Sequence, residues 1–490
     1  MSKRNKNNDI IISFIGGSRD DVCGSAVLIS YPTADGRECI LCDLGMIQGS
    51  MSPNIEYSDN KKMVENVELE HIKAVFLSHA HIDHSGNIPI CGNDKFTGKI
   101  VMDNQTGVIV KDLLKDSVYL HDCLIKYLHS KGKKSKHLYT EVDMYKAFDK
   151  FEIVERHKKY KLNDYVRYEF YSSGHCLGSQ IKFYITMPNK SIKTIVYTGD
   201  LSSKYNAKYK PYNDEMDIIP KANCYIFEAT YGASDGRNFT KKTVENEIKE
   251  LKLKLTDALK NGKKVFIPCF SFARTEEILT LLYDFFKGEQ WFKDLDIPVW
   301  VDGKLTNKIV QRYSEVLEED KLELWNNVRS WPAVKYNKDY QGTLALISAR
   351  KTGIYISSSG FVQPKTRSCD YIKSFLGSEK SLICFIGYYG NEDSIGGQLV
   401  NTPIGKPVNI DGTTVIKSCE VIQFKGFSSH IQQNEIISYF KGINTERILI
   451  HHASQQAKDE IVAIGKEELM KIEKTTRISA TDKHHSQFVI

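Results

Sequence analysis

The feature that most constrains this chain is the six-residue run HAHIDH at 79–84, in which four side chains can bind a metal ion. The run follows an apolar, strand-like segment at 73–78 and precedes turn-forming residues, so we expect a loop at the end of a buried strand. Zinc prefers imidazole and carboxylate ligands. Only 14 of the 490 residues are histidines, and three of them lie in this run beside an aspartate, which indicates a metal site rather than ordinary surface polarity.

The spacing within the run suits two neighbouring metal positions. In an extended chain His79 and His81 point to the same side and Asp83 continues that alternation, whereas His84 points elsewhere. One loop can therefore contribute to two sites. It supplies too few ligands to complete either of them, so further ligands must come from other parts of the chain.

Other strand-end loops carry suitable side chains. A carboxylate has two oxygens and can bridge two metals, which a neutral imidazole cannot do, so Asp200 in TGDLS is a candidate bridge. The remaining candidates are His175 in SGHCLGS, Glu228 in FEATYG, His430 in GFSSH, and His451 and His452 in ILIHH. Any one of these candidates, taken alone, would be interpreted as part of an ordinary turn or as a hydrogen-bonded core group.

The composition is that of a soluble globular protein, with 41% hydrophobic and 26% charged residues. No apolar run approaches the ~20 residues that span a bilayer, and the polar, basic N-terminus does not resemble a signal peptide. Eleven scattered cysteines indicate reduced, mostly buried thiols, so we expect a cytoplasmic protein without membrane association. The net charge of +6 permits a polyanionic partner without demonstrating one.

The pattern of expected elements changes along the chain. Residues 10–48 alternate like strands of a meander, whereas from about residue 236 strands alternate with helices, which is typical of βαβ units and a parallel sheet. We expect a helix over 140–151 with Thr140 as N-cap. The basic segment KGKKSK at 131–136 is interpreted either as a solvated turn or as a nucleic-acid contact.

In this order, the motifs resemble those of a known family. HAHIDH, SGHCLGS and TGDLS are similar to the metal-binding motifs of the metallo-β-lactamase superfamily. FEATYG, GFSSH and ILIHH are similar to motifs A, B and C of its β-CASP subgroup of nucleases, and IPCFSFARTEEIL, SSSGF and GYYGNEDSIGGQL extend the resemblance. The similarity covers residues of about 10–460.

The resemblance implies an α/β fold. An αβ/βα sandwich of two mixed sheets with outer helices would carry an inserted β-CASP domain, a parallel sheet with flanking helices. The expected boundaries place the metallo-β-lactamase domain at 1–234 and 396–475, the β-CASP domain at 235–395 and a polar tail at 476–490.

The resemblance also implies roles for individual residues. His79, His81 and His175 would hold one zinc ion, Asp83, His84 and His451 would hold the other, and Asp200 would bridge the two, with Mn²⁺ as a possible substitute. Asp83 would also orient the attacking water, and His430, oriented by Glu228, would be the general acid. His452 stands where the family usually has glycine, so the register with His452 as the ligand stays open.

The implied substrate is RNA, because a histidine in motif C is associated with RNA in this family, and we expect the RNA to be single-stranded. Cleavage would be endonucleolytic, 5′ exonucleolytic or both, and would leave a 5′-phosphate and a 3′-hydroxyl. Candidate phosphate contacts are Arg274, Ser358, Ser359 and Gly360, although a salt bridge to a neighbouring helix is an equally good interpretation of Arg274. The resemblance also allows a homodimer. The alternatives are a DNA nuclease of the same fold and a non-catalytic subunit of an RNA-processing complex.

Overall fold

Two compact units make up the chain in the computed structural model. It describes residues 8–16, 22, 24–48, 53–204, 216–233, 239–317, 319–390, 392–427, 429–481 and 486–490. The first unit contains the described residues up to 204, then 216–233, and finally those from 429 onward. The second contains the described residues between 239 and 427.

The first unit is built on two seven-stranded mixed sheets. The order of the first sheet is β22-β1-β2-β3-β4-β5-β6, and that of the second is β21-β20-β11-β10-β9-β8-β7. The strands of the first sheet are β1 (Ile11–Gly16), β2 (Ala26–Thr33), β3 (Gly36–Cys42), β4 (Ile72–Phe76), β5 (Lys99–Asp103), β6 (Phe151–Val154) and β22 (Gln487–Val489). Those of the second are β7 (Tyr160–Lys161), β8 (Val166–Ser172), β9 (Ser179–Thr186), β10 (Ile192–Tyr197), β11 (Cys224–Glu228), β20 (Arg447–His451) and β21 (Arg477–Ala480).

The two sheets pack face to face around an aromatic and aliphatic core. Phe76 of β4 lies against Tyr168, Phe170 and Phe183 of the opposite sheet, with ring centroids 4.8, 6.4 and 4.9 Å away. The alternating burial along β8 shows why these segments form strands, since every second side chain enters the core. A sandwich therefore forms, as the α/β fold class predicted.

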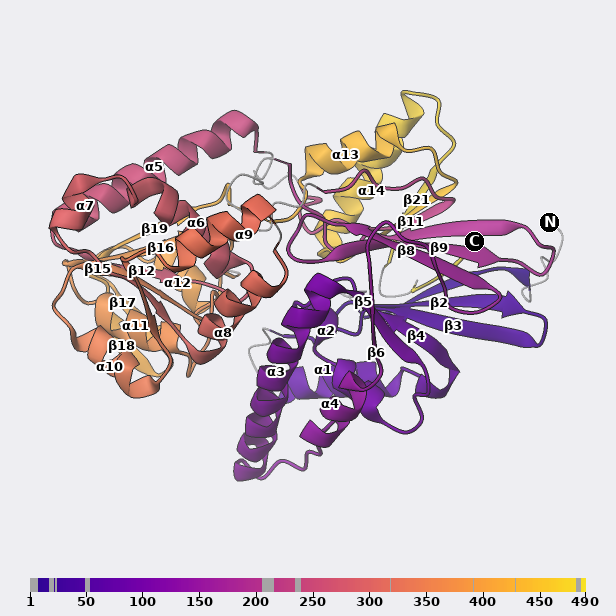
Figure 1. Ribbon diagram of the computed structural model, residues 1–490, viewed down its shortest axis with the longest axis horizontal. Coiled ribbons are helices and arrows are strands. Elements are labelled where there is room, and N and C mark those ends of the chain that lie inside the picture. The colour runs from indigo at the N-terminus through magenta and orange to yellow at the C-terminus, as the bar shows by residue number, and fades with distance from the viewer. Residues whose placement is uncertain are drawn as a thin grey trace. The chain divides into compact units, whose positions relative to one another are not determined.

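Helices cover the outer faces of this sandwich. Figure 1 shows α1, α3 and α4 beside the first sheet, and α13 and α14 beside the second. Their bounds are α1 (Pro53–Glu65), α3 (Asn104–Ser130), α4 (Glu141–Phe148), α13 (Gln433–Gly442) and α14 (Gln455–Met470), while the short helix α2 (Ile82–Ser85) begins within the HAHIDH run. The predicted N-cap is confirmed, because the Thr140 hydroxyl accepts a hydrogen bond from the Asp143 backbone in a capping box.

The second unit is a six-stranded sheet of order β14-β13-β15-β12-β16-β19 in which every strand pair is parallel. This confirms the βαβ pattern. Its strands are β12 (Lys264–Pro268), β13 (Val299–Asp302), β14 (Val334–Asn337), β15 (Gly353–Ser357), β16 (Ser381–Ile386) and β19 (Glu420–Phe424), with a hairpin of β17 (Pro407–Ile410) and β18 (Thr413–Ile416). Its helices are α5 (Lys241–Lys260), α6 (Arg274–Phe286), α7 (Gln290–Asp294), α8 (Lys304–Arg312), α9 (Glu319–Arg329), α10 (Tyr340–Ser348), α11 (Arg367–Phe375) and α12 (Ile395–Asn401).

Two expected boundaries differ from the structure. The second unit does not end at residue 395, because β19 pairs with β16 along Leu382–Ile386 and so extends this sheet to Phe424. The segment 476–490 is also not simply a polar tail, since β21 and β22 add edge strands to the two sheets of the first unit. Short edge strands have little compositional signature, because backbone pairing rather than side-chain burial places them.

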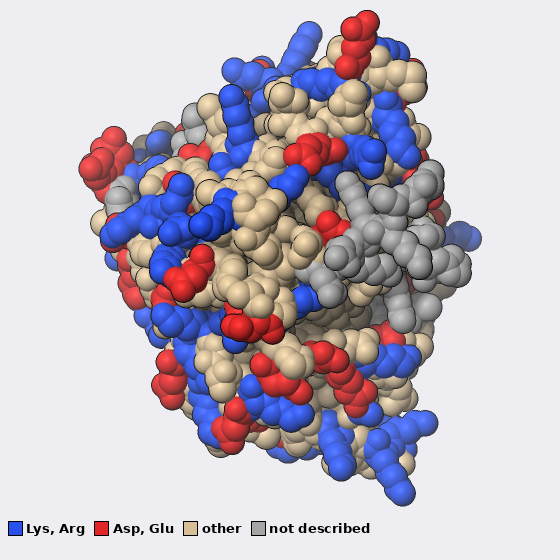
Figure 2. All heavy atoms as spheres, turned by 90° about the vertical axis from the view of Figure 1, so that its right-hand side faces the viewer, with Lys and Arg blue, Asp and Glu red and all other residues tan. Residues whose placement is uncertain are grey.

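In the part of the chain that the structure describes, no helix combines the length and the apolar character that crossing a membrane requires. On the face shown in Figure 2, acidic and basic side chains are interspersed, as the modest net charge of +6 would lead one to expect.

Candidate metal centre

The candidate residues gather where strands of the first unit end. β4 leads into the HAHIDH loop, β10 leads to Asp200, β11 ends at Glu228, and β20 ends at His451. Because β10, β11 and β20 are parallel, their carboxyl ends meet at one edge of the sheet. This edge is where sheets of this kind place their functional groups.

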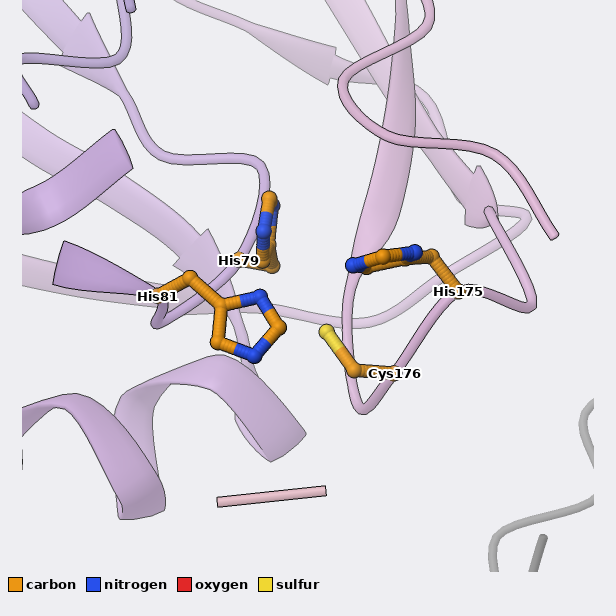
Figure 3. Close-up of side chains that lie close together, drawn as sticks. All are labelled: His79, His81, His175 and Cys176. Carbon is orange, nitrogen blue, oxygen red and sulfur yellow. The ribbon is translucent and has the colours of Figure 1, made fainter. Parts of the chain in front are cut away.

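The first cluster consists of three imidazoles and a thiol. Ligand atoms of His79, His81, His175 and Cys176 all lie within 4.8 Å of one another. The ring centroids of the three histidines are 4.9–5.4 Å apart, and Figure 3 shows the four side chains turned toward a common space. The loops at 79–81 and 173–179 thus place four donor atoms together although they are about a hundred residues apart.

The second cluster contains a carboxylate and two imidazoles. The Oδ2 atom of Asp83 lies 3.5 Å from Nε2 of His452 and 4.0 Å from Nε2 of His84. The two Nε2 atoms are 3.2 Å apart. All three residues can therefore direct ligand atoms at one point.

Asp200 lies between the two clusters. Its Oδ2 atom is 3.7 Å from Nε2 of His79 and 3.6 Å from Nε2 of His175. Its Oδ1 atom is 3.3 Å from Nε2 of His84 and 3.1 Å from Nδ1 of His452. Each carboxylate oxygen thus faces a different group of nitrogens, which is the arrangement that a bridging ligand requires.

His451 does not take the place expected of it. Its Nε2 lies 2.7 Å from the Ser25 hydroxyl, and its ring packs 5.1 Å from that of Phe14. As the last residue of β20 it points between the sheets, whereas the following His452 has a φ of 50° and turns toward Asp83 and Asp200. His452 therefore belongs to the second cluster, which is the alternative that the sequence left open. The prediction that His451 is a metal ligand is wrong.

The donor set fits a divalent cation. Nδ1 of His79 is 3.0 Å from the Ser78 hydroxyl, which leaves Nε2 toward Asp200. This Nε2 and Oδ1 of Asp200 are buried and have no hydrogen-bond partner among the described residues. Buried polar atoms rarely stay unsatisfied, because the loss of their hydration is costly. A bound cation would satisfy both atoms at once.

The protonation states mostly favour metal binding. Burial lowers the pKa of His79 far below its usual range and that of His81 to about 4, so both imidazoles are neutral. Burial alone would raise the pKa of Asp83, but hydrogen bonding from His452 and the charge of His84 lower it to about 2. The pKa of His84 is instead raised, because Asp200 and Asp43 outweigh its burial. A metal must therefore displace the proton on Nε2 of His84.

Asp43, which the sequence did not single out as a site residue, supports both clusters. Its Oδ2 lies 2.6 Å from Nδ1 of His84 and accepts hydrogen bonds from the Ser78 and Tyr197 hydroxyls, each at 2.7 Å. It is fully buried and has a φ of 59°. The only local signal was an Asp at the end of an apolar strand, in LCDLG, which is the same weak signal that marked Asp200.

His430, which is partly exposed, pairs with the buried Glu228 beside the clusters. Nδ1 of His430 lies 3.1 Å from Oε1 of Glu228, which also accepts a hydrogen bond from the Leu201 backbone at 2.7 Å. Burial lowers the pKa of His430, but the carboxylates of Glu228 and Asp200 raise it further, so its net shift is upward. The pair thus holds a proton-carrying imidazole within 3.9 Å of Asp200.

The four expected phosphate contacts all lie in the second unit. Arg274 begins α6, and its Nη1 is 2.5 Å from Oε2 of the buried Glu277, so Arg274 does form a salt bridge, but within its own helix and not to a neighbouring helix as expected. Ser358, Ser359 and Gly360 follow β15, at the carboxyl edge of the parallel sheet. A side chain at Gly360 would meet the Phe270 ring at 3.0 Å, which places this turn beside the segment that leads into α6.

Known proteins resemble this chain over most of its length. Residues 275–399 match the Beta-Casp domain, and residues 414–475 match the Zn-dependent metallo-hydrolase RNA specificity domain. Probable RNase MJ4 of Methanocaldococcus jannaschii is 27% identical over 86% of this chain and 91% of its own. Endoribonuclease YSH1 of Saccharomyces cerevisiae is 23% identical over 85% of this chain, which spans 53% of that protein. A crystal structure of a protein of unknown function from Enterococcus faecalis V583 aligns over 98% of this chain and 100% of its own, with a TM-score of 0.52 and 13% identity, and supports the fold alone.

Proposed function

The chain belongs to the β-CASP group of the metallo-β-lactamase superfamily, and from this premise we propose that it is a ribonuclease that hydrolyses RNA phosphodiester bonds with two bound divalent metal ions. The observation that carries the proposal is the position of Asp200, each of whose oxygens faces a separate group of imidazoles. The relatives named as a probable RNase and as an endoribonuclease support RNA as the substrate.

The proposed ligand sets follow the two clusters. His79, His81 and His175 hold the first ion, and Asp83, His84 and His452 hold the second, with Asp200 shared between them. Zinc is the proposed metal because imidazole and carboxylate ligands suit it, and manganese is a possible substitute. When bound, such a pair of ions activates water and stabilises the charge that develops on the phosphate.

The surrounding side chains have their own tasks. Asp83 remains 28% exposed, so its carboxylate can also orient the attacking water. Glu228 engages Nδ1 of His430, and we assign the Nε2–H of His430 to protonate the leaving 3′-oxygen. The raised pKa of His430 keeps that proton in place near neutral pH. The products would be a 5′-phosphate and a 3′-hydroxyl.

Single-stranded RNA is the proposed substrate form. In the second unit, the Arg274 guanidinium and the turn at Ser358, Ser359 and Gly360 are proposed to contact its phosphates, since guanidinium groups and backbone amides of such turns suit anions. The ion pair of Arg274 with Glu277 would fix the orientation of the guanidinium rather than prevent this contact.

The test compares RNA with DNA. Purified protein is incubated with zinc or manganese and with single-stranded RNA or DNA, each carrying a 5′-phosphate or a 5′-hydroxyl and labelled at either end. We expect cleavage of RNA, with 5′-phosphate products. Faster cleavage of DNA would refute the substrate, and no cleavage of either would refute the activity.

Two variants test the assigned roles. Asp83→Ala is expected to lower the rate of RNA cleavage by at least about 100-fold with the fold intact, while Asp94→Ala, an exposed aspartate, is the matched control. His430→Ala is expected to slow cleavage by roughly 10²–10⁴-fold and to keep both metal equivalents. Loss of one metal equivalent in His430→Ala would instead show that His430 is a metal ligand.

A further inference from the structure

The loop that carries His175 is hydrogen-bonded to the segment that leads into the HAHIDH loop. Ser173 N donates a hydrogen bond to Gly178 O at 3.2 Å, and Ser179 N donates one to Ser78 O at 2.8 Å. Gly178 and His79 also form an isolated antiparallel bridge. The turn between residues 173 and 179 is therefore closed on itself and held in a defined place.

The contact between the two loops is unusually close. A Cβ at Gly178 would lie 2.4 Å from Cβ of His79, so no side chain fits there. Glycine at this position lets the turn approach His79, and the same turn carries Cys176, two residues before Gly178, whose thiol lies in the first cluster. Cys176 is fully buried.

We propose that Cys176 is a sulfur ligand of the first metal position. Its Sγ lies within 4.8 Å of ring nitrogens of His79, His81 and His175, and Figure 3 shows the sulfur directed at the space that the three imidazoles face. This inference rests on the proposed function, because it assigns a further ligand to a metal that the function requires. Nothing in the sequence pattern had indicated a role for this residue.

A sulfur ligand would make the two metal positions different. Thiolate is a soft ligand that selects zinc over manganese, whereas carboxylate oxygens suit manganese as well. The first position then has three nitrogens and a sulfur, with Asp200 shared. The second has Asp83, Asp200 and two imidazoles. Excess manganese would therefore replace zinc at the second position and not at the first.

Cobalt spectroscopy tests the ligand without any RNA. Metal-free protein is reconstituted with Co²⁺, and wild type is expected to show a sulfur-to-cobalt charge-transfer band that Cys176→Ser lacks. Cys91→Ser is the matched control, because Cys91 is equally buried and lies outside the metal clusters. In competition, Cys176→Ser should lose at least about 10-fold in its preference for zinc over manganese.

Each result separates this inference from the proposed function. A cobalt spectrum without the sulfur band, in a protein that still cleaves RNA, would overturn the role of Cys176 and leave the function standing. A sulfur band in a protein that does not cleave RNA would support Cys176 as a ligand and overturn the proposed function. Zinc X-ray absorption on the wild type gives a second test, in which only nitrogen and oxygen neighbours would overturn the inference even if Cys176→Ser failed to fold.

A different part of the first unit carries a second, independent inference. A cavity of about 740 Å³ lies between α1, the end of α3 and the segment 131–136. Its lining includes four lysines and one carboxylate, that of Glu65. The lysines are Lys61, Lys133, Lys134 and Lys136, and Tyr57 and His129 line the same cavity.

Hydrogen bonds hold the backbone of the segment that carries three of these lysines. The Tyr57 hydroxyl donates a hydrogen bond to Lys136 O at 2.9 Å and accepts one from Lys136 N at 3.0 Å. Nε2 of His129 lies 2.8 Å from Ser135 O. The side chains of Lys133, Lys134 and Lys136 have no ion pair with a described acidic residue, and all three are exposed. Exposed cations around a hollow, carried on a backbone that is held in place, suit phosphate groups.

The cavity lies one helix length from the metal centre. α3 has 27 residues, which corresponds to ~40 Å. Its N-cap, Asp103, accepts a hydrogen bond from the Ser179 hydroxyl at 2.7 Å, at the end of the loop that carries His175. Figure 1 shows α3 leading away from the strands. We infer that the cavity binds the backbone of the same RNA, about 12 stacked nucleotides from the scissile bond, so this inference also rests on the proposed function.

The test is RNA binding without cleavage. In an Asp83→Ala background, the triple variant Lys133→Ser, Lys134→Ser, Lys136→Ser should bind a 30-nucleotide RNA more weakly than its parent, with a salt slope smaller by about 2. The control replaces three lysines elsewhere on this unit, Lys95, Lys190 and Lys466. With Asp83 restored, cleavage of a six-nucleotide RNA should stay unchanged. Equal affinity and slope would overturn the inference, whereas absence of RNA binding and cleavage by the unmodified protein would overturn the proposed function.

Discussion

Two adjacent histidines at the end of β20 have opposite environments. His451 is buried between the sheets beside Phe14 and Ser25, and burial lowers its pKa far below the usual range. His452 leaves the strand with a positive φ and faces the two aspartates of the metal centre. The change of direction at a single residue therefore separates a core histidine from a candidate ligand.

This difference predicts distinct effects of two substitutions. His452→Ala should lower the affinity of the second metal position by at least about 10-fold, since it removes a ligand. His451→Ala should keep both metal equivalents and lower the free energy of unfolding by about 1–3 kcal/mol, because the buried Ser25 hydroxyl loses a partner. Metal analysis combined with denaturant unfolding distinguishes the two variants. Loss of metal in His451→Ala but not in His452→Ala would show that His451 is the ligand, as first predicted.

Among the elements, the short strand β22 joins the C-terminal segment to the core. It pairs with β1, and the Phe488 ring packs edge-on against Phe14 at 5.9 Å, next to His451. Phe488→Ala should lower the free energy of unfolding of the first unit by about 3 kcal/mol, because a large, mostly buried ring is removed. Gln487→Ala, an exposed neighbour in the same strand, is the control. Equal midpoints in urea for the two variants would contradict this role of β22.

Helix α6 carries a buried acid that makes the second unit sensitive to pH. Burial raises the pKa of Glu276 well above its usual value, so the folded protein keeps a proton that the unfolded chain releases near pH 4.5. Stability should therefore fall as pH rises above that value, by about 1.4 kcal/mol per pH unit until the folded pKa is reached.

Glu276→Gln should remove this pH dependence and stabilise the second unit at neutral pH, because the amide cannot ionise. The measurement is the free energy of unfolding between about pH 5 and 8, with the exposed Glu245→Gln as control. An unchanged slope in Glu276→Gln would show that this carboxyl does not stay protonated in the fold.

For the whole molecule, metal binding concerns one unit only. Every proposed ligand belongs to the first unit, and they come from segments around residues 79–84, 175, 200 and 452. Chelation should therefore lower the unfolding temperature of the first unit and leave that of the second unchanged. The loss should be about 2.7 kcal/mol for each of the two ions, relative to metal at 100 times the Kd of its site.

Calorimetry can assign the two transitions. Phe488→Ala marks the transition of the first unit, and Glu276→Gln marks that of the second. A shift of the second transition on chelation would contradict the confinement of the metal to the first unit. A missing shift in the first would mean that no ion is bound in the folded protein.

Much of the architecture was predictable because its signals are local. The period of two in β8, the capping box at Thr140 and the strand–helix alternation after residue 236 each depend on neighbours in sequence. The end of the second unit and the strands at the C-terminus were not predictable in this way. β19 and β22 are placed by pairing with strands about 40 and 480 residues away in the sequence.

At the site, the sequence by itself determined which residue types are available and that a dense histidine loop ends a strand. HAHIDH, with His175 and Asp200 later in the chain, was enough to predict a metal centre. Only the tertiary structure decided between His451 and His452, and it alone brought Asp43 and Cys176 to the centre. The physical reason is that a ligand is defined by the direction of its side chain toward residues far away in sequence, and that direction depends on backbone turns and close approaches that spacing does not encode.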